Sequence, residues 1–165
     1  GYLPFGSDPF DPESRRVGAL ERVIATDGIK AAYTAASGQV LDVPQIFDAA
    51  QSGDSVAQQV IEQTARHMAR AVAAIAAVAA PELVILGGSI GARPEIVEAT
   101  RRELALCFPF PVRIEPSRLG NHAALSGAVA VGLTGLHTTL FGQSAPGAVV
   151  TLPTPKGGLA QRAAE

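Results

Sequence analysis

Residues 81–89 place two adjacent glycines, Gly87 and Gly88, directly after a short apolar run rich in branched side chains. A run of this length bounded by Pro and Gly is typical of a buried parallel strand, and ligands of open α/β sheets bind beyond the carboxyl ends of such strands. Because glycine has no side chain, the pair would let a small molecule approach the backbone. The same pair is equally typical of a tight strand-to-helix turn without a ligand.

Few other side chains could do acid–base or nucleophilic chemistry. The histidines titrate near neutrality, but His67 falls on the polar side of a long predicted helix and His137 near a helix end, so we interpret both as structural. His122 starts a helix near the predicted crevice and is the better ligand candidate, although a cap at Asn121 explains that pair without a ligand. Cys107 is most simply a small buried hydrophobic side chain. We therefore predict no catalytic residue and no metal ligand.

The composition is that of a soluble globular domain, with 165 residues, 47% of them hydrophobic, and a formal net charge of −2. No long basic run offers a footprint for nucleic acid, so we expect no DNA binding by this chain itself. A single cysteine excludes a disulfide framework and favours a reducing compartment, of which the cytoplasm is the simplest. The Ala-rich stretch 71–80 is too short to cross a bilayer, and the amino end lacks a signal pattern. We expect no membrane partner.

The elements that must position the glycine pair begin with a loop and short helices. Residues 1–6 form a strand-like run without an initiator methionine, so we interpret the chain as a fragment. Residues 7–16 mix Asp, Pro, Ser and Arg without apolar periodicity and predict an exposed loop. Helical spacing over residues 20–24, a break at 27–28 and renewed spacing over 29–36 predict two short helices.

A long helix leads into the glycine-containing strand. Asp42 and Pro44 start a helix, because proline is tolerated in a first turn. After Asp54, apolar residues step by threes and fours until Pro81, which predicts a helix over residues 54–80. The Ala-rich second half of this helix offers a side for packing against a twin subunit, so we expect a homodimer.

The chain then continues as strand, helix, strand and helix. Pro94 starts a helix, and residues 112–115 alternate as a second strand, which predicts a parallel pair joined by a right-handed crossover. The small-residue pattern over 121–137 predicts a last helix. Residues 142–165 are rich in Gly, Pro and Ala with little periodicity, and we predict a flexible tail.

Three segments in this order resemble the carboxyl-terminal half of the ROK family of sugar kinases and sugar-responsive repressors: Gly18-Ala-Leu-Glu21, residues 81–88, and the Leu-Gly-Asn-His-Ala-Ala-Leu-Ser-Gly-Ala run at 119–128. The resemblance implies an α/β fold that is half of an actin-like, ribonuclease H-like ATPase domain, with helices packed on a mixed sheet containing a parallel strand pair. It assigns residues 1–141 to the carboxyl-terminal lobe of a sugar-binding, kinase-like domain. The lobe with the phosphate loop and catalytic aspartate, and any winged helix-turn-helix, would lie outside this chain.

The resemblance also implies roles for four residues. In kinases of the family the Gly-Gly loop faces the adenosine part of ATP, which gives Gly87 and Gly88 a nucleotide-binding role, and a purine suits a slot without side chains. Glu21 matches a glutamate that accepts hydrogen bonds from sugar hydroxyls. Without the resemblance, Glu21 is a solvated carboxylate near a helix amino end. Family members carry a Glu-x-Gly-His run ahead of this loop, whereas here Gly1 is followed by Tyr2, which could donate a hydrogen bond to a sugar or stack on it.

One departure from the family pattern concerns metal. Many members carry a cysteine cluster and a histidine that bind structural zinc ahead of the glutamate, but this chain has Ala19 where a ligating cysteine usually stands. Tetrahedral zinc needs about four Cys or His ligands, and residues 7–16 offer none. We therefore expect no zinc and no cofactor, with ATP and Mg²⁺ only if the chain belongs to a kinase.

Three functions are open at this point. The preferred one is the effector-binding and dimerising part of a sugar-responsive transcriptional regulator, which binds a sugar or sugar phosphate and reaches DNA only through a separate amino-terminal domain. The second is the carboxyl-terminal half of an ATP-dependent, glucokinase-like sugar kinase, inactive as this fragment. The third is a non-catalytic assembly module of the same fold. Fold similarity alone does not decide among them.

Overall fold

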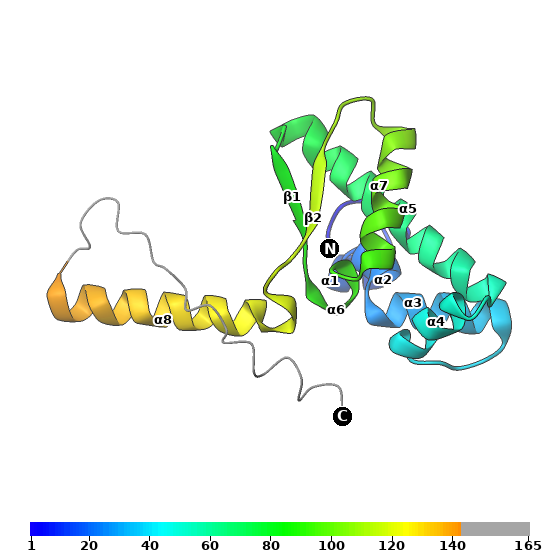
Figure 1. The fold of residues 1–165 in the computed structure, drawn as a ribbon, viewed down its shortest axis with the longest axis horizontal. Coiled ribbons are helices and arrows are strands. Elements are labelled where there is room, and N and C mark those ends of the chain that lie inside the picture. The colour runs from blue at the N-terminus through cyan, green and yellow to red at the C-terminus, as the bar shows by residue number, and fades with distance from the viewer. Residues whose placement is uncertain (143–165) are drawn as a thin grey trace. The chain divides into compact units, whose positions relative to one another are not determined.

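The computed structural model describes residues 1–142, in two units that are considered separately, residues 1–120 and the helix that follows (Figure 1). Apart from Gly142, the predicted tail lies outside the described residues. The first unit contains α1 (Pro12–Val17), α2 (Glu21–Ile24), α3 (Thr26–Ser37), α4 (Val43–Gln51), α5 (Ser55–Ala79), β1 (Leu83–Leu86), α6 (Gly88–Gly91), α7 (Pro94–Cys107) and β2 (Arg113–Pro116). A 3₁₀ turn, Gly120–His122, precedes α8 (Ala123–Phe141).

Strands β1 and β2 form a two-stranded parallel sheet, as the sequence predicts, with Val84 opposite Ile114. Helix α7 connects the two strands, and α5 and α7 pack together beside them (Figure 1). A buried cluster joins the helices to the sheet through Val72, Val97 and Ile114. The apolar run before the glycine pair is therefore a strand that ends where α6 begins.

The prediction that β1 is a buried strand is correct for one face only. Val84 and Leu86 pack against the helix-facing cluster, whereas Leu83 and Ile85 are 37% and 61% exposed. Successive side chains of a strand point to opposite faces, and the described helices cover only one face of this sheet. The run of apolar residues predicts the strand correctly but not the exposure of its second face.

Helix α5 is the longest element of the first unit and has the predicted boundaries to within a residue at each end. The Asp54 carboxylate accepts hydrogen bonds from the backbone N–H groups of Val56 and Ala57, which otherwise have no partner within the helix. The same carboxylate accepts a 2.8 Å hydrogen bond from the Tyr33 hydroxyl of α3. These hydrogen bonds lower the Asp54 pKa, and the bond from the Ala57 N–H has the largest effect, followed by the bond from the Tyr33 hydroxyl. One side chain thus caps α5 and ties it to α3.

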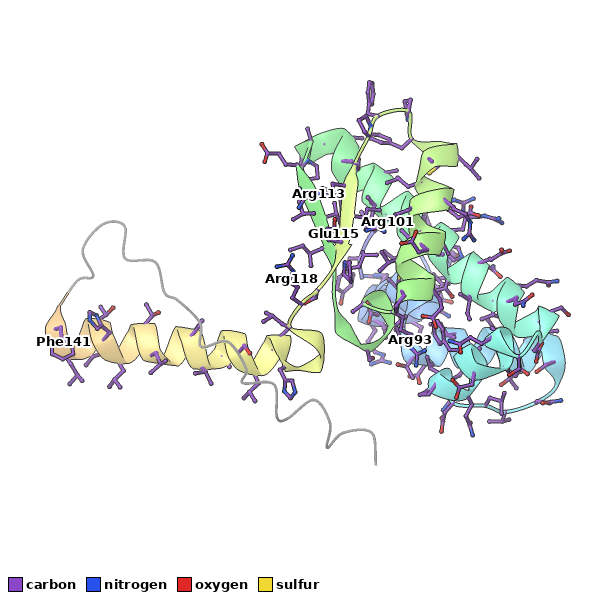
Figure 2. All side chains as sticks on the ribbon, in the orientation of Figure 1. Arg93, Arg101, Arg113, Glu115, Arg118 and Phe141 are labelled. Carbon is purple, nitrogen blue, oxygen red and sulfur yellow. The ribbon has the colours of Figure 1, made fainter. Side chains whose placement is uncertain are left out.

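An arginine fixes the position of β2 against α7. The guanidinium of Arg101 donates two hydrogen bonds to the backbone carbonyl of Ile114 and forms an ion pair with Glu98 on its own helix. Arg101 extends from α7 toward β2, where Glu115 lies 3.6 Å from it (Figure 2). Cys107, at the end of the same helix, is exposed, so the prediction that it is a buried hydrophobic side chain is wrong.

The amino-terminal segment differs from its prediction in two places. Residues 1–6 contain no strand, and the predicted loop 7–16 contains most of α1, because Asp11 caps that helix through the Glu13 N–H and Pro12 suits its first turn. The break between α2 and α3 lies at Ala25 and not at residues 27–28, which belong to the first turn of α3.

Gly28 allows α2 and α3 to pack closely. A Cβ built on it would lie 2.2 Å from the Arg22 carbonyl oxygen, so only a residue without a side chain lets the end of α2 lie this close to α3. Sequence alone suggests a helix break at this glycine, whereas the structure uses it as a contact between two helices.

The second unit is α8, which has 19 residues, no charged side chain and exposed leucine and valine residues along its length. It extends four residues beyond the predicted end, to Phe141. By length and composition alone α8 could span a bilayer, and core helices of soluble proteins share these properties. His137 lies against Phe141 on this helix, with ring centroids 5.1 Å apart.

We expect Gly28→Ala to destabilise the chain by about 2 kcal/mol and lower its Tm by several degrees, because the added methyl group forces α2 away from α3. Thermal unfolding followed by circular dichroism measures the change. Gly135→Ala is the matched control, since a Cβ there meets nothing within 4 Å and alanine favours a helix. Equal melting temperatures for the wild type and Gly28→Ala would contradict this account of the α2–α3 contact.

Candidate binding pocket

A pocket of about 500 Å³ lies where α2, the second half of α5, β1 and the glycine pair meet. Its wall on α5 is apolar and includes Met68, Ala71 and Ile75, and β1 contributes Val84 and Ile85. The complete lining is Glu21, Ile24, Ala25, Thr26, Met68, Ala71, Val72, Ile75, Val84, Ile85, Leu86, Gly87, Gly88, Ser89, Ile90 and Gly91. A mostly apolar wall with a few polar groups at defined positions is the usual construction of a small-molecule site.

The polar groups of the pocket come from two separate segments. Glu21 and Thr26 belong to α2 and the start of α3, and Ser89 follows the glycine pair in α6. Among the described residues that line the pocket, Glu21 is the one carboxylate, and there is no Lys, Arg or His. The lining is therefore suited to a ligand with hydroxyl groups and an apolar face, and it carries no cationic group for a phosphate.

Glu21 is the first residue of α2, a helix of four residues. The backbone N–H groups of Leu20 and Glu21 donate to the Gly1 carbonyl at 3.0 and 3.2 Å, so this start of the helix is held by the amino-terminal segment. Glu21 is partly buried and lines the pocket. A carboxylate in this position can accept hydrogen bonds from neighbouring hydroxyl groups of a ligand.

The two glycines of the pair have different reasons to be glycine. Gly88 has a φ of +79°, in the left-handed region that favours glycine, so its conformation accounts for it. Gly87 has φ −120° and ψ −180°, an extended conformation open to any residue. A Cβ on Gly87 would lie 3.7 Å from the Ser117 Cβ, which is an ordinary contact. Neither backbone strain nor crowding requires glycine at position 87. The physical consequence of this glycine is that the pocket wall has bare backbone there.

Tyr2 does not line the pocket. Its side chain is 69% exposed, and its hydroxyl donates a 3.1 Å hydrogen bond to the Arg16 carbonyl at the end of α1. The structure therefore brings Glu21, Gly87 and Gly88 together and leaves Tyr2 outside. A sugar contact by Tyr2 stays a prediction.

Sequence reasoning missed Thr26 and Ser89, which also line the pocket. Ser89 could have been found from its place directly after the glycine pair, at the carboxyl end of the strand. Thr26 has no comparable signal, because its position depends on the break at Ala25, which the sequence places elsewhere.

Of the histidines, His67 belongs to the unit that contains the pocket, and it does not line the pocket. His67 on α5 is partly buried, and its Nδ1 atom has no hydrogen-bond partner within the described part of the chain. Burial first, and then the charges of Arg70 and Arg66, lower the His67 pKa. His122 is exposed at the start of α8. Within residues 1–142, no group of three or more His, Cys, Asp or Glu side chains is arranged to hold a metal ion.

Comparison with known proteins agrees with this geometry. Residues 15–134 match the sequence profile of the ROK family, a range that ends inside α8. N-acetylmannosamine kinase of Escherichia coli K12 is 38% identical over 89 residues, which are 52% of this chain and 30% of that protein. The ROK hexokinase of Thermus thermophilus superposes with a TM-score of 0.56 and 28% identity, covering 67% of this chain and 39% of the hexokinase.

A third relative shares the fold at lower identity. A ROK family protein of Streptococcus pneumoniae, solved in complex with sucrose, has a TM-score of 0.63 and 20% identity over 74% of this chain and 44% of its own. This chain thus spans between 30% and 44% of the length of the three relatives. The strands and helices are a fragment of the actin-like ATPase fold of these neighbours. Because the family profile covers most of the sequence, the chain belongs to the ROK family.

Proposed function

We propose that this chain is the sugar-binding, carboxyl-terminal part of a ROK protein, with Glu21 as a hydrogen-bond acceptor for sugar hydroxyls. The observation that carries the proposal is that Glu21 and the glycine pair, which lie far apart in the sequence, line the same pocket. Carboxylates suit neighbouring hydroxyl groups because each oxygen can accept a charge-assisted hydrogen bond. The apolar wall formed by α5 and β1 suits the carbon-bound face of a sugar or a purine.

The bare backbone at Gly87 supports a second part of the proposal, a nucleotide or similar flat group beside the glycine pair. A flat ring can lie against a wall that has no side chain, and position 87 has no conformational or steric need for glycine. We assign Gly88 to the turn and Gly87 to the ligand. Any ATP and Mg²⁺ would belong to the kinase alternative below.

Within the family we favour a sugar-responsive regulator, in which this chain senses the effector. The support is the departure from the family's metal pattern, with Ala19 where a zinc-ligating cysteine usually stands. A kinase has less freedom than a regulator to lose parts that hold its substrate. Ligand binding would shift a conformational equilibrium and so change DNA affinity through another part of the protein. A homodimer remains part of this proposal.

The alternative is the carboxyl-terminal portion of a sugar kinase. The relatives favour it, because the protein that is 38% identical over 89 residues is an N-acetylmannosamine kinase and a structural neighbour is a hexokinase. In that case the groups that hold phosphate and accept the substrate proton come from polypeptide outside this chain. The pocket described here would still bind the sugar.

Binding of N-acetylmannosamine and glucose, measured by isothermal titration calorimetry, tests the role of Glu21. We expect Glu21→Gln to weaken the affinity for the bound sugar roughly tenfold or more, because hydrogen bonds to a charged acceptor contribute about 1.5–3 kcal/mol. Glu82→Gln is the matched control, an exposed carboxylate outside the pocket, and it should bind like the wild type. Equal sugar affinity in the wild type and Glu21→Gln would exclude Glu21 as a sugar ligand.

The glycine pair gives a second test. We expect Gly87→Ala to keep the wild-type Tm but lose affinity for ATP or the sugar, since the methyl group fits the fold and is added to a residue that lines the pocket. Gly88→Ala should instead lower stability by about 1 kcal/mol, because alanine is strained at positive φ. Thermal unfolding and calorimetry on the two variants separate these effects. Unchanged ligand affinity in a stable Gly87→Ala protein would remove the ligand role of position 87.

This chain alone should not transfer phosphate from ATP to N-acetylmannosamine or glucose, because the described lining lacks the cationic groups that phosphoryl transfer uses. A coupled assay for ADP release measures the activity. Sugar-dependent ADP release that rises with protein concentration and disappears in Glu21→Gln would refute the expectation that the groups for phosphoryl transfer lie outside this chain.

A further inference from the structure

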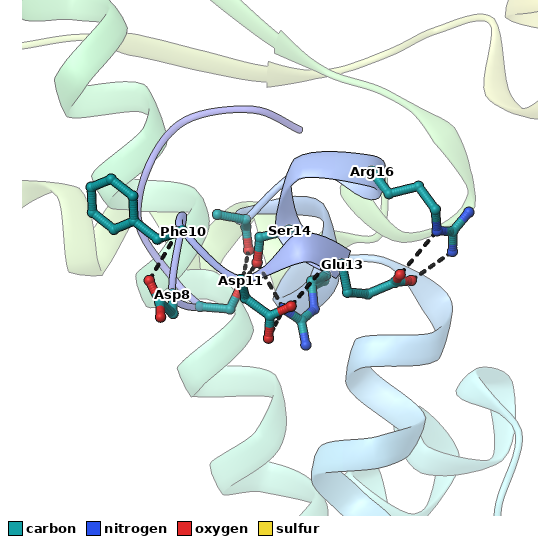
Figure 3. Close-up of polar contacts among 9 residues, drawn as sticks. Asp8, Phe10, Asp11, Glu13, Ser14 and Arg16 are labelled. Carbon is teal, nitrogen blue, oxygen red and sulfur yellow. Dashed lines mark hydrogen bonds and ion pairs between the residues drawn. The ribbon is translucent and has the colours of Figure 1, made fainter.

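A network of polar side chains joins the segment before α1 to α2 (Figure 3). The Arg22 guanidinium donates a 2.7 Å hydrogen bond to the Ser14 hydroxyl, and its Nη1 atom lies 3.1 Å from the Asp11 carboxylate. The Ser7 hydroxyl donates to the Ala19 carbonyl at 2.9 Å and lies 3.0 Å from the Ser14 hydroxyl. Residues before α1 (Ser7 and Asp11) and within it (Ser14) are thus connected to Ala19 and to Arg22 of α2.

Asp11 has two partners at once. Its Oδ1 atom accepts a 2.7 Å hydrogen bond from the Glu13 N–H and so caps α1, while its Oδ2 atom faces Arg22. The hydrogen bond from Glu13, followed by Arg22, lowers the Asp11 pKa. The carboxylate therefore fixes the beginning of α1 relative to Arg22 on the next helix.

Helix α2 depends on such contacts because it has four residues. An isolated helix of this length is unstable, so its direction is set by the groups that hold it. Arg22 is the neighbour of Glu21, the carboxylate that lines the pocket. Any rotation of α2 that released Arg22 from Asp11 and Ser14 would also move Glu21.

We propose that Arg22 is a positioning residue, which holds α2 through Asp11 and Ser14 and thereby fixes the Glu21 carboxylate at the pocket. The proposal rests on the proposed function in its use of Glu21 as the sugar ligand. Arg22 itself does not line the pocket, so it acts through its neighbour and not by contact with the sugar.

The position of the network distinguishes it from an ordinary surface ion pair. Exposed ion pairs contribute little to stability, and the Arg16–Glu13 pair on α1, with side chains 72% and 47% exposed, is of that kind. Arg22 and Asp11 are 31% and 39% exposed, and the hydroxyl that Arg22 contacts belongs to Ser14, which is 2% exposed. Loss of Arg22 would leave this buried hydroxyl with one fewer partner.

The test compares Arg22→Met with Arg16→Met in the full chain. Methionine keeps an apolar stem in each case but removes the guanidinium, and Arg16 shares α1 with the network without contacting α2 (Figure 3). The first readout is sugar affinity by calorimetry. The second is backbone hydrogen exchange by mass spectrometry over residues 19–25, compared with the residues of α7.

We expect Arg22→Met to weaken sugar binding roughly tenfold, as for loss of a coupled contact of about 1.4 kcal/mol. Exchange over residues 19–25 should accelerate while α7 is unchanged, and Arg16→Met should match the wild type in both readouts. Arg22→Lys keeps the positive charge but lacks the guanidinium that contacts both Ser14 and Asp11, and it should give an intermediate affinity. It also serves as the test if Arg22→Met does not fold.

Two results would overturn the proposal. One is wild-type exchange over residues 19–25 in Arg22→Met, because α2 would then hold its position without the guanidinium. The other is faster exchange in α2 and α7 alike, with unchanged sugar affinity, which is the signature of a general loss of stability. Absence of sugar binding by the wild type, or equal binding by Glu21→Gln, refutes the proposed function, and the exchange comparison then decides the role of Arg22 on its own.

Discussion

The packing of α5 against its neighbours is the constraint on which the first unit depends. Its first half is buried against α3 and α4 through residues such as Val60 and Ile61, and its second half against α7 and the sheet through Ala69 and Val72. One helix thus connects both buried clusters, and its remaining side forms a wall of the pocket. The candidate pocket is thus built on the element that joins both clusters, whereas its polar residues come from short segments next to that element.

The sequence predicts the elements that carry a long periodic signal. Helix α5, the strand before the glycine pair and the parallel pairing of β1 with β2 all follow from apolar spacing and from Pro and Gly boundaries. Features that depend on a distant partner were not predictable in this way. The role of Gly28 depends on the Arg22 carbonyl, and the exposure of Ile85 depends on which sheet face the helices cover.

The candidate site shows the same division. From the residues alone the strand and its glycines indicate a ligand crevice or a tight turn equally well. A role for Glu21 came only from the family resemblance, because a carboxylate at a helix start usually only faces solvent. Sequence also could not separate the two glycines. The distinction between Gly88, which the turn requires, and Gly87, which it does not, needs the backbone angles.

The Tyr33–Asp54 hydrogen bond has a consequence for protein engineering. Because the same carboxylate also caps α5, the helix does not begin independently of α3. Moving α5 into a homologous scaffold without a tyrosine at the matching place would keep the local amino-end signal but lose the attachment to the preceding helix. A chimera that exchanges residues 33–79 as one block preserves both interactions, so the natural unit of recombination in this region is larger than the helix.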